Sequence, residues 1–484
     1  MLETLRSPRR LTTEILAGLV TSLALIPEVV SFAVIAGVDP KVALYTSCIM
    51  AMTIAFVGGR PAMVSAAAGA TALVIAPLVA SHGLDYLIAA VWLAGALQIV
   101  LAVAGVAKLM RFIPRSVMIG FVNALAILIF TAQLRHLFDV PWAVYPLVAG
   151  GIAMIVFIPK LTTAVPAALI AIVVLTGIVV LFGLDVPDVA DQGELPGGFP
   201  TWMIPDVPLN AETLRIIAPY AVGLALVGLM ESLMTAKLVD DITETPSHKG
   251  RESWALGVSN ILAGFYGGIA GCAMIGQTVL NVKTGQARTR ISTLVAGVFL
   301  LALVTGLSSI MAQIPMVALA AVMMVVAVTT VDWHSVKPST LKRMPIPETI
   351  VMGVTVAVVV MTGNLAYGVL VGVILAMVLF ARRVAHVISV NRILADDGES
   401  VRYEVEGPLF FGSSNDLVEQ FAYAEDPASI TIDLSRAQIW DASTVAALDS
   451  IETKYGDHGA TVTIKGLDER STGFHRRLTG HLGV

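Results

Sequence analysis

The chain has 484 residues, of which 56% are hydrophobic and 13% are charged, and its mean hydropathy is +0.84. These values exclude an ordinary soluble globular protein and leave room for many membrane spans of about 20 residues each. The formal net charge of −5 points to no particular partner. The only two cysteines, Cys48 and Cys272, lie in apolar segments, so the sequence predicts neither a disulfide framework nor a zinc site.

Long apolar runs follow one another along the chain in two sets, separated by an acidic, proline-containing loop at 183–215. The twelve runs are 11–30, 42–57, 86–106, 116–132, 144–160, 164–182, 216–239, 254–266, 291–311, 316–331, 350–362 and 365–380. Two further segments, 66–79 and 272–282, are apolar but short and rich in Ala and Gly. We expect these two segments to be half-length helices.

The distribution of charge favours counting both short segments as crossings. Lys and Arg collect in the cytoplasmic loops of membrane proteins. With fourteen crossings, the basic loops fall on one side of the membrane and the acidic loop at 183–215 on the other. We therefore predict a multi-pass protein of the cell (inner) membrane, with its amino terminus and its carboxyl-terminal part in the cytoplasm.

A repeated motif places one short segment in each half of the chain. Phe-Val-Gly-Gly at 56–59 precedes the first, and Phe-Tyr-Gly-Gly at 265–268 precedes the second. Seven crossings per half is an odd number, so the two halves would form a 7+7 inverted repeat, as in many secondary transporters.

Short helices that begin in mid-membrane direct free backbone N–H groups and the positive end of a helix dipole at the bilayer centre. Two such ends that face each other would bind an anion, and small residues would allow the ligand to approach the backbone. Small residues also let membrane helices pack, which is the alternative explanation. The predicted substrate-binding residues are Ala68, Gly69, Ala70, Thr71, Ala273, Met274, Ile275 and Gln277.

Ionisable side chains inside predicted spans are the second sign of a site, because a charge in the bilayer is costly. Glu231 lies well inside the run 216–239, and Thr235 is one helical turn further on the same face. We interpret this pair as a coupling-ion site for H⁺ or Na⁺, the alternative being a neutral structural carboxylic acid. Glu28, which follows Pro27 in the first span, is a further candidate that could instead reach the membrane interface.

Beyond the last span the pattern changes to that of a small α/β domain. Strands are predicted from residue 401, at 429–434 and at 460–465, with helices at 415–422 and from 442 to 454. Asp441 precedes the second helix and is expected to be its N-cap. The predicted domains are thus a transport domain at 1–390 and a cytoplasmic domain at 395–484.

Several motifs resemble the SulP sulfate-permease and solute-carrier anion family over nearly the whole chain. They are Leu-Ile-Pro-Glu at 25–28, Ala-Gly-Val-Asp-Pro at 36–40 and Thr-Val-Leu-Asn-Val at 278–282. The carboxyl-terminal domain resembles the STAS fold, whose signature loop corresponds to 441–444, and in soluble relatives a serine there is phosphorylated. The resemblance implies a core and a gate domain, an anion held between the third and tenth helices, and a homodimer.

Two positions depart from the family pattern. Many members carry a Ser-Phe-Ser-Arg-like run where this chain has Met-Ile-Gly-Gln at 274–277, so Gln277 supplies hydrogen bonds in place of a fixed positive charge. The usual Gln after the first proline is Glu28 here. A cation bound at Glu231 would compensate by neutralising that carboxylate.

We therefore expect a secondary active transporter of a small anion such as sulfate, bicarbonate or a small dicarboxylate, a symporter coupled to H⁺ or Na⁺. No cofactor and no nucleic-acid partner are expected, and the STAS domain could bind a cytoplasmic protein. The eight histidines are scattered without catalytic or metal-ligand spacing, so we do not expect an enzyme. The alternatives are a channel or nucleobase permease on the same architecture, or a membrane sensor that signals through the STAS domain.

Overall fold

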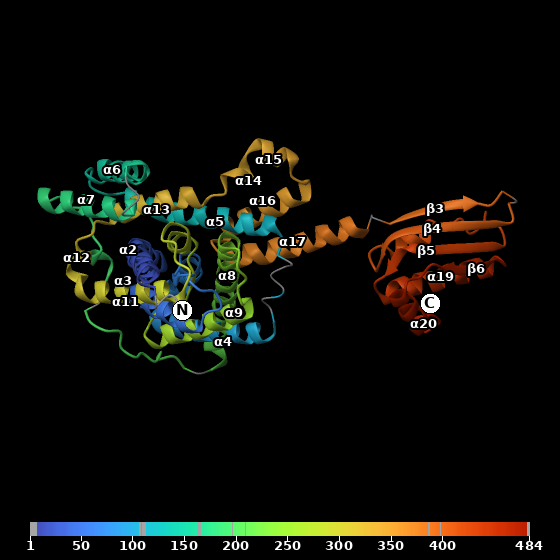
Figure 1. Cartoon of the computed structure of the whole chain (residues 1–484), viewed down its shortest axis with the longest axis horizontal. Helices are drawn as coiled ribbons and strands as arrows, with labels where there is room; N and C mark the ends of the chain where they lie inside the picture. Colours follow the sequence, from blue (N-terminus) through green and yellow to red (C-terminus); the bar gives the residue numbers. More distant parts are fainter. Residues whose placement is uncertain are drawn as a thin grey trace. The chain divides into compact units, whose positions relative to one another are not determined.

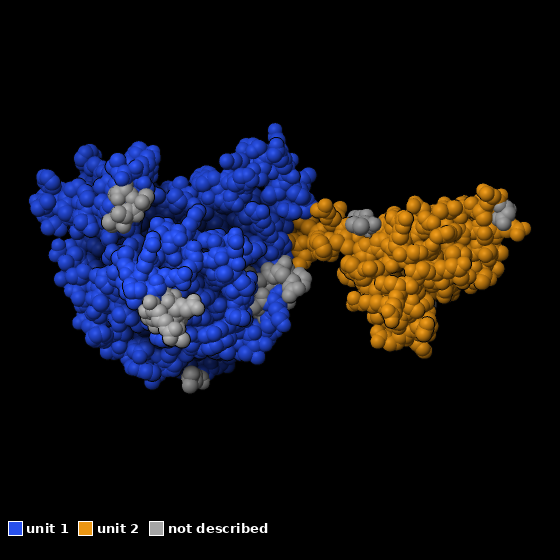
Figure 2. All heavy atoms as spheres, viewed as in Figure 1, with its two compact units in different colours: residues 1–373 blue, residues 374–484 orange. Residues whose placement is uncertain are grey.

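The computed structural model describes residues 7–105, 108, 113–161, 166–195, 197–208, 210–385, 388–396 and 398–481. The chain forms two compact units, 1–373 and 374–484 (Figure 2). The first is almost wholly helical, and the second is built around a four-stranded sheet (Figure 1). The predicted fold class, a helical membrane protein with a small α/β domain at its carboxyl end, is confirmed.

The first unit is a bundle of apolar helices. In chain order its longer elements are α2 (Pro8–Ala36), α3 (Pro40–Val57), α4 (Gly69–Val103), α5 (Arg115–Leu134), α6 (Val144–Phe157), α7 (Ala167–Phe182), α8 (Ala211–Thr243), α9 (Lys249–Phe265), α11 (Arg290–Gly306), α13 (Met316–Thr330), α16 (Ile346–Thr362) and the first part of α17 (Leu365–Ala385), which continues into the second unit. Short helices α12 (Ser308–Ala312), α14 (Trp333–Val336) and α15 (Pro338–Arg343) lie between them.

These helices coincide with the predicted spans. Within the described part of the chain, six helices are long and apolar enough to cross a membrane, and five more apolar helices are shorter. Each of the twelve predicted apolar runs is mainly helical; residue 106 and residues 164–165, at the ends of two runs, lie outside the described residues. The count of fourteen crossings stays a prediction.

The helices pack in two groups. In the first group, α4 packs against α8 and α9, while α11 packs against α2 and α3. In the second group, α5 packs against α13 and α16, and α6 packs against α7 and α13. Figure 1 shows the second group above the first, and α2 contacts α7 and α13 across the boundary.

The two segments predicted as half-length helices both begin in strands, which is a correction. Residues 66 and 67 belong to β1 (Ser65–Ala67), and residues 272 and 273 belong to β2 (Gly271–Ala273). Helices begin only at Gly69, in α4, and at Ile275, in α10 (Ile275–Val279), which continues as a π-helical turn at Leu280–Thr284. The backbone at these residues is extended because each strand supplies hydrogen-bond partners for the N–H and C=O groups of the other, which have no water to bind inside an apolar bundle.

The first short helix is not separated from the following span by a loop. It is continuous with the run 86–106 in α4, and the two parts are divided by a kink at Gly83, where φ is 79° and ψ is −169°. That backbone conformation is open essentially to glycine alone. The half-length element is thus 69–82, ended by one residue.

The acidic loop predicted at 183–215 ends earlier, because α8 already begins at Ala211. Its first part links the two helix groups. Backbone bonds join Val189 to Ile314, before α13, and Lys41, in α3, to Glu194. Lys41 also forms an ion pair with Glu194.

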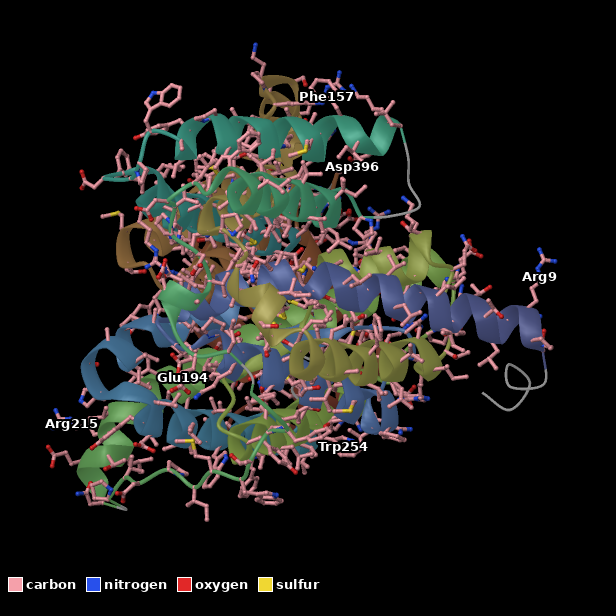
Figure 3. The ribbon with its side chains drawn as sticks, turned by 90° about the vertical axis from the view of Figure 1, so that its left-hand side faces the viewer. Arg9, Phe157, Glu194, Arg215, Trp254 and Asp396 are labelled. Atoms are coloured by element: carbon pink, nitrogen blue, oxygen red, sulfur yellow. The ribbon has the colours of Figure 1, made fainter. Side chains whose placement is uncertain are left out.

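The amino-terminal end of α2 and the acidic loop lie at opposite ends of the first unit. Figure 3 shows Arg9, at the start of α2, far from Glu194, in the acidic loop, while Arg215 lies at the same end as Glu194. The sorting of positive charge to one side of the membrane stays a prediction.

The second unit contains the sheet β3-β4-β5-β6, with β3 antiparallel to β4 and the other pairs parallel. Its elements are β3 (Ser389–Leu394), β4 (Ser400–Leu409), α18 (Ser414–Glu419), β5 (Ser429–Ile439), α19 (Ala442–Asp457), β6 (Thr461–Lys465) and α20 (Glu469–Leu478). The predicted strands and helices are present, although α18 is shorter than the predicted helix at 415–422. The sequence reading missed β3 and α20.

A buried carboxylate organises the core of this second unit. The Asp426 side chain accepts hydrogen bonds from the hydroxyls of Tyr403 and Tyr455, each at 2.5 Å. It also forms an ion pair with Arg392 at 2.7 Å. Burial raises the pKa of both tyrosines, which keeps their hydroxyls protonated as donors.

The predicted N-cap of α19 is confirmed. The Asp441 carboxylate accepts from the backbone N–H of Thr444 at 3.1 Å, and also from that of Phe411 at 2.6 Å. Thr444 is buried and Ser443 is exposed, so of these two hydroxyls only that of Ser443 is accessible.

Candidate functional site

The centre of the first unit is a pair of short antiparallel strands. Ser65, Ala66 and Ala67 of β1 lie opposite Ala273, Cys272 and Gly271 of β2. Each strand leads directly into a helix start, β1 into α4 and β2 into α10. The two helices therefore begin close to the same strand pair, which is the arrangement that an anion site between them requires.

The two helix starts are tied to each other in the same way. The Thr71 hydroxyl of α4 donates to the carbonyl of Ala270, just before β2, at 2.8 Å. The Thr278 hydroxyl of α10 accepts from the N–H of Val64, just before β1, at 3.0 Å. Each helix thus fixes the strand that leads into the other.

Polar side chains from the surrounding helices complete the hydrogen bonding of the strands. Ser47 of α3 accepts from the N–H of Ala67 at 3.2 Å, and Ser232 of α8 accepts from the N–H of Ala273 at 3.0 Å. Asn260 of α9 accepts from the N–H of Gly271 at 2.9 Å. Extended backbone is stable inside a membrane protein only when its polar groups are paired in this way.

Neither helix start is capped by a side chain. The N-cap residues are Ala68 for α4 and Met274 for α10, and neither makes a side-chain cap hydrogen bond. Helix starts without a capping oxygen leave the positive end of the dipole available to another acceptor. An anion is the partner that such a pair of ends favours.

Both predicted intramembrane carboxylates contact the segment that leads from β2 into α10. The thiol of Cys272 donates to the Glu231 carboxylate at 2.9 Å. The Glu28 carboxyl of α2 lies beside the Gln277 side chain. The structure thus brings together two residues on which the sequence departs from the family pattern, Glu28 and Gln277, and it places Glu231 beside the strand that leads into the same helix.

The Thr235 hydroxyl donates to the main-chain carbonyl of Glu231 at 2.8 Å and not to its carboxylate. The donor to the Glu231 carboxylate is the thiol of Cys272, which sequence reasoning did not assign to the site. Thr71 is likewise engaged, since its hydroxyl donates to main-chain carbonyls of Ala68 and Ala270.

The remaining predicted residues differ in accessibility. The side chains of Ala68, Ala70 and Ala273 are buried, with at most 1% exposed, and Met274 is 5% exposed. Ile275 is half-buried. Gly69 packs so closely that an added Cβ would lie 2.8 Å from the ring of Phe32. Phe32, near the end of α2, packs against this helix start, a contact that an apolar run of sequence does not reveal.

A buried carboxylate and two arginine side chains fix the loop after α3. Glu252 of α9 is fully buried and accepts from the N–H groups of Gly59 and Arg60 at 2.6 and 3.0 Å. Arg251 and Arg290 donate to carbonyls at the end of α3. This network holds the Gly-Gly turn that leads into β1, and sequence reading had assigned its arginines only to the basic side.

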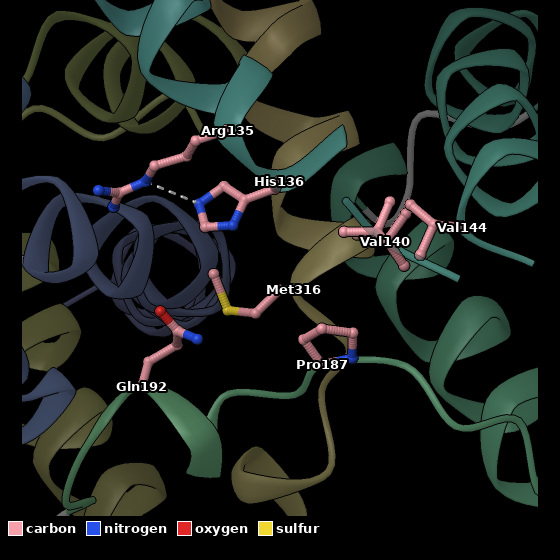
Figure 4. Close-up of a pocket in the computed structure, with 8 residues that line it drawn as sticks. Arg135, His136, Val140, Val144, Pro187, Gln192 and Met316 are labelled. Atoms are coloured by element: carbon pink, nitrogen blue, oxygen red, sulfur yellow. Dashed lines mark hydrogen bonds between the residues drawn. The ribbon is translucent and has the colours of Figure 1, made fainter. Parts of the chain in front are cut away.

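A separate pocket of about 340 Å³ lies between the second helix group and the acidic loop. Arg135, His136, Gln192 and Met316 line it (Figure 4). One amino group of Arg135 donates to the carbonyl of Val34, near the end of α2, at 2.7 Å. Arg135, which follows α5, thereby joins the second helix group to the first. Among the described residues, no group of three or more His, Cys, Asp or Glu side chains could hold a metal ion.

The sequence matches known family models over most of its length. Residues 11–144 and 142–344 match the sulfate permease family, and residues 393–474 match the STAS domain. The chain is 49% identical over 465 residues to "Putative sulfate transporter YbaR" of Bacillus subtilis (strain 168), with 96% of each chain covered. It is 25% identical to "Bicarbonate transporter BicA" of Picosynechococcus sp. (strain ATCC 27264 / PCC 7002 / PR-6), with 91% of this chain and 86% of the relative covered.

The fold is also that of a solved transporter. The murine Slc26a9 anion transporter in its inward-facing state matches with a TM-score of 0.83 at 17% identity, over 96% of this chain and 87% of that one. At this identity the likeness concerns the fold alone. Taken with the family matches, it establishes that this chain is a multi-pass membrane protein with a STAS domain and belongs to the sulfate permease family, whose members are anion transporters and not enzymes.

Proposed function

We propose that the chain is a secondary active transporter of a small anion, which binds between the starts of α4 and α10. The observation that carries this proposal is the pair of uncapped helix starts joined by β1 and β2. The anion would accept hydrogen bonds from backbone N–H groups of the two first turns and from the Gln277 amide. Such a site recognises charge and size, because its donors are mostly backbone.

The two carboxylates support coupling to a cation. Neither helix start carries an arginine, while Glu231 and Glu28 both contact the 272–277 segment. Two ionised carboxylates so close would repel an anion. We therefore propose that H⁺ or Na⁺ binds with the anion as a symported ion, chiefly at Glu231, with the carbonyl-bonded Thr235 hydroxyl as a neighbouring oxygen.

Alternating access would follow from movement of one helix group against the other. The first group holds both helix starts, and the second group packs against it mainly through α2. The inverted repeat, the fourteen crossings and the domain limits 1–390 and 395–484 belong to this proposal. So do the homodimer, the cell-membrane location, the cytoplasmic side of the amino terminus and STAS domain, and a cytoplasmic protein partner of that domain.

Sulfate and bicarbonate are the first anions to test. The relatives named above are described as a sulfate transporter and a bicarbonate transporter. Small dicarboxylates would fit the same backbone donors and form a third class.

The test is uptake of labelled sulfate, bicarbonate and a dicarboxylate into proteoliposomes under imposed H⁺ and Na⁺ gradients. We expect one of the three anions to accumulate inside the proteoliposomes, driven by either the H⁺ or the Na⁺ gradient. Glu231→Gln should lower gradient-driven accumulation by about tenfold while leaving exchange of the anion, because a neutral amide mimics the cation-loaded carboxyl. Accumulation by Glu231→Gln that still follows the gradient would refute the coupling role, and no uptake of any anion by the intact protein would refute the transport assignment.

A further inference from the structure

A second cavity, of about 690 Å³, lies where α4, α5, α8 and α9 come together. Its lining is partly cationic and partly apolar. Lys108, Lys237 and Lys249 come from three separate segments, and Val103, Ile113 and Met118 supply apolar surface. These residues take no part in the site between α4 and α10.

Among the described residues that line the cavity there are three lysines and no acidic side chain. Asp240 is the acidic group nearest to Lys249, at 3.3 Å, but it also binds Arg60 at 2.9 Å. One carboxylate thus faces two cations, and Lys237 adds another positive charge on the cavity wall. An anionic ligand would balance this excess.

The apolar part of the lining selects among anions. Val103, at the end of α4, is 84% exposed, and the cavity is many times larger than an inorganic oxyanion. A ligand that used the whole cavity would need a charged head and an apolar tail. Basic pockets between membrane helices on the lysine-rich side bind phospholipid head groups in this manner.

We propose that this cavity binds one phospholipid with an anionic, phosphate-bearing head group. The phosphate contacts Lys237 and Lys249, and an acyl chain lies along Val103 and Met118. The site joins the end of α4, in the first helix group, to the start of α5, in the second. The lipid therefore acts as a contact between the two groups.

The experiment measures binding of phosphatidylglycerol to the purified full-length protein, by native mass spectrometry and by the shift in thermal unfolding. Each lysine near an anionic head group contributes a factor of about five, so Lys237→Gln with Lys249→Gln should weaken binding by about 30-fold. Lys237→Arg with Lys249→Arg should retain it, because the charge is kept. The matched control removes two exposed lysines that do not line the cavity, Lys337→Gln and Lys342→Gln, and should bind as the unmodified protein does.

Three results would overturn the proposal. Equal retention of phosphatidylcholine and phosphatidylglycerol would show that the cavity does not select for the charge of the head group. An equal loss of binding in the control variant would assign the effect to general surface charge. Stabilisation by inorganic phosphate as large as that by phosphatidylglycerol would identify a site for a free anion. Because the readout is lipid binding, these results are independent of whether the protein transports an anion.

Discussion

The starts of α4 and α10 share a backbone plan but differ in their surroundings. At α4 the groups are packed and paired. Gly69 lies against Phe32 and Ile129, and the Thr71 hydroxyl is held by two carbonyls. This start is a rigid support, with little side-chain chemistry left for a ligand.

At the start of α10, by contrast, a polar side-chain group remains without a hydrogen-bond partner among the described residues. The Gln277 side chain is 2% exposed, and its carbonyl oxygen has no partner among the described residues. Gly276 is exposed with open space around its Cα, and both carboxylates contact this segment. The helix then continues as a π-helical turn, a feature that is frequent at functional sites. The comparison shows two similar helix starts that differ in what they leave for a ligand: α4 offers only backbone groups, whereas α10 offers backbone groups and the Gln277 side chain.

The largest effect is expected where the two halves meet. A Cβ added to Gly271 would lie 2.2 Å from the carbonyl oxygen of Ala66 and 2.3 Å from the sulfur of Met50. Gly271→Ala must push the strands apart, so we expect a loss of about 3 kcal/mol or more and little monodisperse protein. Yield after solubilisation and the Tm measure this. Gly276→Ala, which meets no atom within 4 Å, is the control. A folded, active Gly271→Ala variant would contradict the close pairing of β1 and β2.

A second test separates binding from support. Gln277→Ala removes an amide that faces Glu28, so the anion concentration for half-maximal uptake should rise by about tenfold with little change in Tm. Thr71→Val, on the other helix, removes the bond to Ala270 and should cost about 1 kcal/mol of stability without changing that concentration. If the two variants exchange these phenotypes, α4 is the binding half and the comparison is reversed.

The sequence predicted the elements whose physical signals are local. Apolar runs marked the spans, and the Gly-Gly pairs at 58–59 and 267–268 marked the turns that lead from α3 to β1 and from α9 to β2. Glu231 and Glu28 stood out because a carboxylate in a span is costly. The N-cap role of Asp441 could be read from its position before a helical pattern.

Features that depend on distant partners could not be read. The run Ser-Ala-Ala at 65–67 contains no strand signal, and it is extended only because Gly271 and its neighbours lie opposite it. The link from Cys272 to Glu231 spans 41 residues, and the cysteine is one apolar residue among many in the sequence. A signal for the polar support of the strands did exist in Ser47, Ser232 and Asn260, which are polar residues inside apolar spans.

The smallest expected effect concerns Cys272, the thiol that donates to Glu231. If a proton is the coupling ion, uptake is greatest at low pH and falls as Glu231 ionises. Removing the donor in Cys272→Ala makes the ionised carboxylate less favourable, so the pH of half-maximal uptake should rise by about half a unit to one unit. Cys272→Ser keeps a donor and should leave the midpoint near or below that of the unmodified protein. A cavity in the alanine variant would lower Tm in either case, so the midpoint and not the stability decides. Identical midpoints for the alanine and serine variants would assign Cys272 to packing alone, and the binding chemistry of the α10 half would then rest on Gln277 and the two carboxylates.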